Sequence, residues 1–143
     1  MGYKWSEFKL EPQIIERKIM INDTLEVAVR GYLPIGDKID LINYVINHAY
    51  CNPIYPEYEA IREEVFFSIA LVNKYTDIEF SEEDLQAPYS LYDVLETNYI
   101  IDKVIGAIPK EEFNYLQTLL RETIRKRKER EKGGTIYETS IVK

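Results

Sequence analysis

The residues best suited to chemistry in this chain are His48 and Cys51, which stand three positions apart. Imidazole nitrogen and thiolate sulfur are the usual ligands of structural zinc, and such a site takes four ligands. The sequence contains 1 histidine and 1 cysteine, so a zinc site would need carboxylates for its remaining ligands. A lone pair of this kind is more often structural. We therefore expect neither a metal site nor a cofactor.

Catalytic triads, paired carboxylates and nucleotide-binding loops have no better support. No nucleophile elbow or comparable signature accompanies the histidine. The acid clusters Glu63-Glu64 and Glu82-Glu83-Asp84 are contiguous, so their carboxyls point to different sides of a helix instead of facing each other across a cleft. The glycines form neither GxxxxGK nor GxGxxG. We therefore expect a protein that is not an enzyme and has no small-molecule substrate.

The basic run at 121–132 offers a different chemistry, which is the recognition of acidic surfaces. It holds seven bases and three acids, whereas residues 51–100 hold eleven acids and two bases. One interpretation is a solvated helix end, because cations are favoured near the negative end of the helix dipole. The other is an anchor that meets an acidic partner. The cations proposed for such contacts are Arg125, Lys126, Arg127, Lys128 and Arg130.

This uneven charge also bears on the class of partner. The net charge of the chain is −7, and an acidic body repels phosphate, which argues against direct nucleic-acid binding. A chain with an acidic middle and a basic end can instead pair head to tail with copies of itself. Its 12 tyrosines favour the same interpretation, since tyrosine gives a large contact area at low entropic cost.

The elements that must position these residues follow from the apolar pattern. It predicts an α+β, mostly α fold, in which an N-terminal β-hairpin packs on a bundle of about five helices. The strands are expected at 13–21 and 25–32, on either side of the turn dipeptide Asn22-Asp23. Helices are expected at 37–50, 58–75, after the N-cap Ser81, and at 89–96, 99–108 and 109–132.

Two of these helices carry specific expectations about burial. Residues 65–72 are apolar nearly all round, which is typical of a core helix. In the last helix the apolar stripe stops at Ile124, so its final turns are expected to project from the core. For the helix at 37–50 we expect one buried face, formed by Ile39, Ile42, Val45, Ile46 and Ala49.

Both ends of the chain are predicted to be extended arms around a single domain at 13–132. In the N-terminal arm, residues 1–12, Trp5 and Phe8 are large apolar groups that dock either on their own core or on a neighbour. Gly133-Gly134 is expected to end the last helix and act as a hinge for an extended tail at 133–143. The tail would then add as a strand to a neighbour's sheet through Ile136, Tyr137, Ile141 and Val142.

No targeting signal is evident. The first residues lack the apolar core of a secretory signal, and no apolar run approaches the roughly 18 to 20 residues that span a bilayer. A single cysteine cannot form an internal disulfide, which is consistent with synthesis in a reducing cytoplasm. We expect no membrane partner.

Three stretches carry a family resemblance: "GYLPIGDKIDLINYVINHAY", "YTDIEFSEEDL" and "LYDVLETNYIIDKVIGAIPKEEFNYL". Over roughly residues 14–120 the chain resembles a family of small proteins encoded in the structural gene clusters of tailed phages and prophages of low-GC Gram-positive bacteria. The resemblance implies a virion component or assembly factor of the head-tail or tail region. It transfers no functional residues, and the basic helix and its glycine pair lie outside it.

The expected function is therefore that of a non-enzymatic phage structural or assembly protein, made in the host cytoplasm and located in the virion. It would act through contacts with copies of itself or with other virion proteins, with its terminal arms linking subunits. Two alternatives stay open. One is a tail-assembly chaperone that is absent from the finished particle. The other is an acidic inhibitor of a host defence system, which would imitate DNA phosphate.

Overall fold

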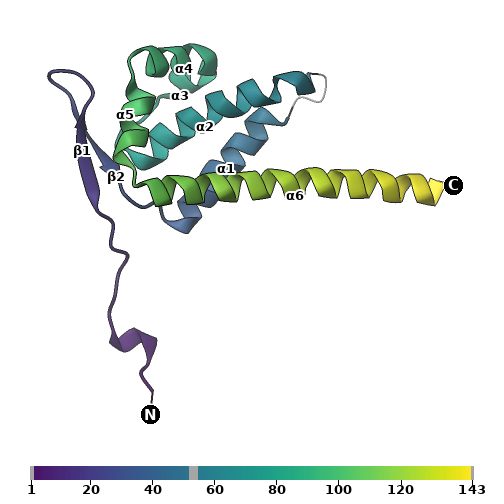
Figure 1. The fold of residues 1–143 in the computed structure, drawn as a ribbon, viewed down its shortest axis with the longest axis horizontal. Helices are drawn as coiled ribbons and strands as arrows, with labels where there is room; N and C mark the ends of the chain where they lie inside the picture. Colours follow the sequence, from purple (N-terminus) through teal and green to yellow (C-terminus); the bar gives the residue numbers. More distant parts are fainter. Residues whose placement is uncertain (1, 52–54, 143) are drawn as a thin grey trace.

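Helices dominate the structure, and a two-stranded antiparallel hairpin lies near the N-terminus (Figure 1). The computed structural model describes residues 2–51 and 55–142, with side chains as far as residue 131. The predicted α+β, mostly α class is confirmed. The elements are the 3-10 helix η1 (Trp5–Glu7), β1 (Glu16–Met20), β2 (Glu26–Arg30), α1 (Ile35–Ala49), the 3-10 helix η2 (Pro56–Tyr58), α2 (Glu59–Tyr75), α3 (Glu82–Gln86), α4 (Pro88–Thr97), α5 (Ile100–Ala107) and α6 (Lys110–Val142).

The hairpin packs on the helices, as a two-stranded sheet must to be stable. The side-chain oxygen of Asn22 accepts the backbone N–H of Leu25 at 3.0 Å, which closes the predicted turn. Val27 and Val29 of β2 face the core and are buried. An isolated bridge joins Val29 to Thr76 just beyond α2.

The helix α2 runs through the centre of the core, where it lies against α1. Every residue from 65 to 72 is buried, which confirms the prediction of a core helix. The buried face of α1 differs from the expected one, because Ile39 is exposed. The face is centred on Lys38 instead, since Ile39 lies about 100° further round the helix. Its members are Lys38, Leu41, Ile42, Val45, Ile46 and Ala49.

Lys38 is only 1% exposed and belongs to a buried polar network. Its ammonium lies 3.0 Å from a carboxylate oxygen of Glu112, near the start of α6. The same carboxylate accepts the backbone N–H of Leu33 at 2.8 Å and the hydroxyl of Tyr75 at 2.7 Å. Burial raises the pKa of Tyr75, and the hydrogen bond to Glu112 acts in the same direction. The network joins α1, α2, α6 and the segment that follows β2.

The short helices α3, α4 and α5 cover one side of α2 (Figure 1). Ser81 caps α3 as predicted: its hydroxyl accepts the N–H of Asp84 at 3.1 Å, and the Asp84 carboxylate accepts the N–H of Ser81 at 3.0 Å. Between α4 and α5 the chain turns at Tyr99, which adopts a left-handed conformation with φ of 60°.

The helix α6 is longer than predicted, since it runs from Lys110 to Val142 without a break at Gly133-Gly134. The expected hinge and extended C-terminal tail are therefore wrong. Two glycines cost about 1 kcal/mol each relative to alanine in a helix, but they keep their N–H groups and introduce no clash. Among the α6 residues whose side chains are described, the last buried one is Ile124, and the C-terminal part of the helix extends away from the body (Figure 1).

The N-terminal arm leaves the hairpin and runs away from the body, as Figure 1 shows. At its root the backbone N–H of Gly31 donates to the carbonyl oxygen of Ile15 at 2.7 Å. A Cβ at position 31 would lie 2.9 Å from that oxygen. Only glycine admits this close approach without a backbone shift.

Candidate interaction surfaces

The N-terminal arm carries a small aromatic cluster that lies outside the core. A 3-10 turn brings the Trp5 and Phe8 rings to 5.9 Å between centroids, and Tyr3 lies 5.7 Å from Phe8. Trp5 is 73% exposed and Tyr3 is 84% exposed. Of the two docking places predicted for Trp5 and Phe8, their own core is therefore not the one used in this structure.

The apolar character of the arm continues to the first strand. Its exposed large hydrophobic side chains are Tyr3, Trp5, Phe8, Leu10, Ile14 and Ile15. Single exposed hydrophobic residues are ordinary, but a continuous series of them is typical of a contact surface. Burying such a surface in a complex removes apolar area from water, which favours association to the extent that it exceeds the entropy lost on binding. The arm is therefore suited to contact a partner.

Part of the basic run contacts acids of its own chain. Arg121 forms an ion pair with Glu63 of α2, and Lys128 lies 3.5 Å from Glu59 of the same helix. Lys128 also lies over the ring of Tyr50, at 5.1 Å from its centroid. These contacts attach the middle of α6 to the first turns of α2.

Other cations of the run are paired within α6. Arg125 contacts Glu122 at 2.7 Å and Glu129 at 2.6 Å, and Arg127 contacts Glu131 at 3.2 Å. Spacings of three and four residues place these partners on the same side of the helix. The hydrogen bond from Arg125 lowers the pKa of Glu122. Such exposed pairs contribute little stability. They are consistent both with a solvated helix end and with an anchor that can exchange these pairs for an acidic partner.

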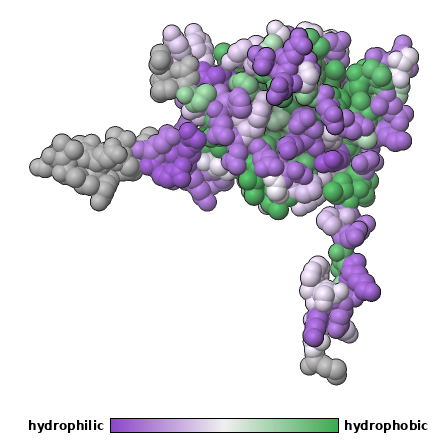
Figure 2. Space-filling model, turned by 180° about the vertical axis from the view of Figure 1, so that it is seen from behind, coloured by the Kyte–Doolittle hydropathy of each residue, from purple (hydrophilic) through white to green (hydrophobic). Residues whose placement is uncertain are grey.

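Lys126 and Arg130 line a polar groove between α1 and α6, together with Arg127. This basic groove has a volume of about 360 Å³ and is lined by Asn43, Ile46, Asn47, Thr123, Lys126, Arg127 and Arg130. Within the described part of the chain, neither Lys126 nor Arg130 has a carboxylate at ion-pair distance. Figure 2 shows the described end of α6 standing out as a hydrophilic segment. Ammonium, guanidinium and amide donors together are suited to bind carboxylates.

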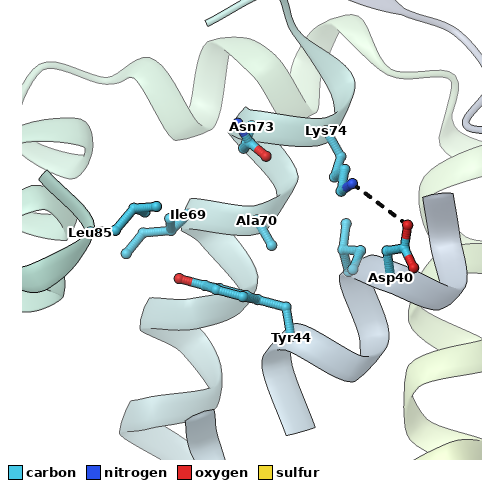
Figure 3. A pocket seen from close by; sticks show the side chains of 8 residues that line it. Asp40, Tyr44, Ile69, Ala70, Asn73, Lys74 and Leu85 are labelled. Carbon is cyan, nitrogen blue, oxygen red and sulfur yellow. Dashed lines mark ion pairs between the residues drawn. The ribbon is translucent and has the colours of Figure 1, made fainter. Parts of the chain in front are cut away.

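A second hollow lies between α1, α2 and α3 and is mainly apolar. This apolar pocket has a volume of about 360 Å³. Its apolar lining consists of Leu41, Tyr44, Ile69, Ala70 and Leu85. In Figure 3, Leu85 of α3 points toward Ile69, and the Tyr44 ring extends beneath them. Burial raises the pKa of the Tyr44 hydroxyl.

The rim of the apolar pocket is polar and charged. Asp40 and Asn73 line it, together with Lys74. The Lys74 ammonium lies 3.9 Å from a carboxylate oxygen of Asp40 and 3.9 Å from one of Asp37. Figure 3 shows this ion pair on the side of the pocket opposite Leu85. One cation therefore faces two anions at the rim.

The C-terminal residues predicted to pair as a strand are Ile136, Tyr137, Ile141 and Val142. Their backbone belongs to α6 in this structure, and a helical backbone offers no free ladder of donors and acceptors. Strand addition to a neighbour's sheet would therefore require this end of the helix to unwind, and it stays a prediction. Their side chains lie outside the part of the chain whose side chains the structure describes.

His48 and Cys51 lie close together, but both are exposed and make only local contacts. The Nδ1 of His48 lies 2.8 Å from the Tyr44 carbonyl, and its ring stacks 4.3 Å from Tyr44 and 4.9 Å from Phe66. The thiol of Cys51 donates to the His48 carbonyl at 3.5 Å. Among the described residues there is no group of three potential metal ligands, and no described helix has both the length and the apolarity to cross a bilayer.

Comparisons with protein-family models, with curated proteins and with solved structures find no match for this chain. Sequence patterns had not indicated the apolar pocket or the amide side of the basic groove. Asn43 and Asn47 are four residues apart, which places both on one helix side. However, nothing in the sequence shows that α6 lies beside them. Leu85 and Tyr44 line one pocket only because the chain after α2 folds back and places α3 beside it.

Proposed function

We propose that this protein is a non-enzymatic structural or assembly protein of a tailed-phage virion, acting in the head-tail or tail region. Its subunits bind one another, or other virion proteins, through the N-terminal arm. The observation that supports this proposal is the arm itself, with its exposed aromatic cluster around Trp5 and Phe8. A folded chain that keeps such a segment away from its own core has it available for another surface.

The charges of the chain support a second contact of the same kind. The basic groove presents Lys126 and Arg130 on one side of the molecule. The acids Glu82 and Glu83 of α3 are exposed in the part of the chain that is most acidic. Complementary charges steer association and fix the orientation of partners. Two copies can therefore bring the groove of one against the acidic α3 region of the other.

Self-association of the purified full chain tests the proposal. We expect light scattering to show an oligomer whose mass falls to that of a monomer when residues 2–12 are deleted. Circular dichroism and the melting temperature should stay the same, since the arm lies outside the core. The double variant Trp5→Ser/Phe8→Ser should behave like the deletion. Tyr99→Asn is the matched control, because Tyr99 is an exposed aromatic on the body and asparagine accepts its left-handed backbone.

Equal masses for the full chain and the deletion variant would overturn the role of the arm. The place in the virion needs a separate measurement, which is quantitative mass spectrometry of purified particles. Peptides of this chain in fixed stoichiometry with the other virion proteins are the expected result. Presence in the infected-cell lysate without presence in particles would contradict a virion protein and favour an assembly chaperone.

A further inference from the structure

We infer that the outer edge of β1 is the surface on which the root of the N-terminal arm binds a second copy, through antiparallel pairing of residues 14–20 with the same residues of that copy. This inference rests on the proposed self-association and adds where the contact begins. The pairing joins two two-stranded hairpins into one four-stranded sheet. An unpaired strand edge binds another strand through its backbone hydrogen bonds.

The hydrogen bonds of the hairpin show which backbone groups of β1 are directed away from β2. Gly31 donates its N–H to the carbonyl oxygen of Ile15 at 2.7 Å, and Ile21 donates its N–H to that of Leu25 at 2.8 Å. Along an antiparallel strand, successive residues direct their N–H and C=O groups alternately toward the partner strand and away from it. The odd-numbered residues of β1 therefore bond to β2, and the even-numbered ones direct these groups outward.

The residues that form this outer edge are Glu16, Lys18 and Met20, and all three are exposed. Within the described part of the chain, their backbone N–H and C=O groups make no hydrogen bond. The far edge of the sheet is partly covered, because Val29 of β2 forms a bridge with Thr76. Figure 1 shows β1 as the outer strand of the hairpin, with the arm continuing from it away from the body. The edge of β1 is therefore open to a partner strand.

The charged side chains of β1 favour one register of this pairing. In a two-fold antiparallel pair, the residue on the axis lies opposite its own copy. With Arg17 on the axis, Glu16 of each copy lies opposite Lys18 of the other, so the contact contains two cross-strand ion pairs. With the axis at Glu16 or at Lys18, identical charges lie opposite each other and both ion pairs are lost. The one like-charge pair of the favoured register is Arg17 with its own copy.

The other charges on this face of the hairpin agree with the register. Lys18 lies 3.4 Å from Glu26 of the same chain, and Glu16 lies opposite Arg30. These two acids and two bases balance, so no excess of one sign opposes the contact. In the paired sheet, Glu16 lies between Arg30 of its own hairpin and Lys18 of the second copy. The signs of the charges therefore alternate across the joined strands.

Exposed apolar side chains meet in the same register. Ile15 is 82% exposed and lies opposite Ile19 of the second copy, a side chain at the margin of that copy's core. Ile14 lies opposite Met20, and both side chains are exposed in the single chain. Each of these pairs occurs twice in the two-fold contact. The pairing therefore removes from water the apolar groups at the root of the arm.

The aromatic cluster of the arm completes the contact. Strand pairing over residues 14–20 is short and includes the arginine pair, whereas association carries a large entropic cost. Residues 2–12 of each copy continue past the Asn22 turn of the other, where Leu25 is exposed. Deletion of residues 2–12 is therefore still expected to give a monomer. A two-fold pair is closed, so the head-to-tail contact of the basic groove joins one pair to the next.

A cysteine on the two-fold axis tests the register. Opposed residues that are not hydrogen-bonded, as Arg17 and its copy are here, have Cα atoms about 4.5 Å apart, within the range of a disulfide. We expect Arg17→Cys, made in a Cys51→Ser chain because Cys51 is exposed, to form a disulfide-linked dimer on mild oxidation. Met20→Cys in the same chain is the matched control, because its two copies lie roughly 20 Å apart along the strands. The Arg17→Cys chain should cross-link at least about tenfold faster, since pairing gives its thiols a high effective concentration.

Reversal of the opposed charges tests the pairing without a cysteine. Glu16→Lys places a lysine opposite each Lys18, and we expect light scattering to show association weakened about tenfold. Lys18→Glu in the same chain reverses both pairs and should restore it. Glu26→Lys is the matched control, because it makes the same change of charge on the same face but lies on β2, away from the joined edge. Its effect on association should be smaller, and circular dichroism should show that all these chains stay folded.

The outcomes separate this inference from the proposed function. If deletion of residues 2–12 abolishes association, but Arg17→Cys cross-links no faster than Met20→Cys and Glu16→Lys has no effect, the arm binds elsewhere and the edge pairing is overturned. If the deletion leaves the mass unchanged, the proposed role of the arm fails, while fast cross-linking at position 17 still supports the pairing. A full chain that is monomeric and cross-links at neither position contradicts both.

Discussion

At the scale of residues, the least expected feature is a lysine at the centre of an otherwise apolar helix face. Apolar periodicity located most of the buried face of α1 but assigned Ile39 in place of Lys38, because a hydropathy pattern treats any lysine as exposed. Lys38 is buried only because Glu112, 74 positions along the chain, lies beside it. A pairing of that sequence separation cannot be derived from local pattern, and neither can the hydroxyl of Tyr75 that completes it.

The Glu112 carboxylate is therefore a position where substitution is costly. Glu112→Gln leaves the Lys38 ammonium buried without its counter-charge, and we expect a loss of about 3–5 kcal/mol in the free energy of unfolding. Urea titration followed by circular dichroism measures it. Glu111→Gln is the control, since Glu111 is the exposed neighbour in the same turn. A loss below about 1 kcal/mol would contradict a stabilising role of the buried network, because an exposed ion pair already contributes about that much to the free energy of unfolding.

The hydroxyl of Tyr75 makes stability depend on pH at the alkaline end. Its pKa is raised in the folded protein by burial and by Glu112, whereas an unfolded tyrosine titrates near pH 10. Its contribution is fully present below about pH 10 and is lost as pH rises from there toward the folded pKa. We expect the free energy of unfolding of the natural chain to fall more steeply above about pH 10 than that of Tyr75→Phe. Parallel slopes from urea titrations at several pH values would count against this.

At the scale of elements, local chemistry predicted the structure well. The turn at Asn22, the cap at Ser81 and the apolar run at 65–72 each carry a short-range signal, and each appears in the structure. The end of α6 is the exception. A glycine pair is a common C-terminal signal, yet its penalty is small enough for a long helix to continue through it.

Replacing the glycine pair tests the continuity of α6. If the helix runs to Val142, Gly133→Ala/Gly134→Ala relieves a cost of about 1 kcal/mol per residue. We expect a higher helix content by circular dichroism and unchanged self-association. A lower helix content, or lost association, would show that the glycines are needed for a bend. The single variant Gly36→Ala, in the first turn of α1 where a Cβ meets nothing within 4 Å, is a control for the general effect of alanine.

At the scale of the whole molecule, the charge layout gives a test of the basic groove. Lys126→Glu/Arg130→Glu reverses the groove cations that have no carboxylate partner among the described residues, and we expect about tenfold weaker self-association. Arg125→Glu is the matched control, because Arg125 is already engaged by Glu122 and Glu129, and its effect should be smaller. Raising the salt concentration from about 0.1 M to about 1 M should weaken the self-association of the natural chain until it approaches that of the double variant. Equal effects of both variants would contradict a distinct groove contact.

The close approach of Gly31 to Ile15 has a consequence for the geometry of any assembly. Because no side chain fits there, the hydrogen bond from Gly31 holds Ile15, the root of the arm, at the edge of the hairpin, and in the proposed assembly the arm would reach the next copy from this point. A head-to-tail contact with a fixed turn closes into a ring when the rotation divides a full circle and otherwise grows as a helical filament. In the proposed assembly, the glycine at the root of the arm would therefore influence whether the contact between copies closes into a ring or continues as a filament.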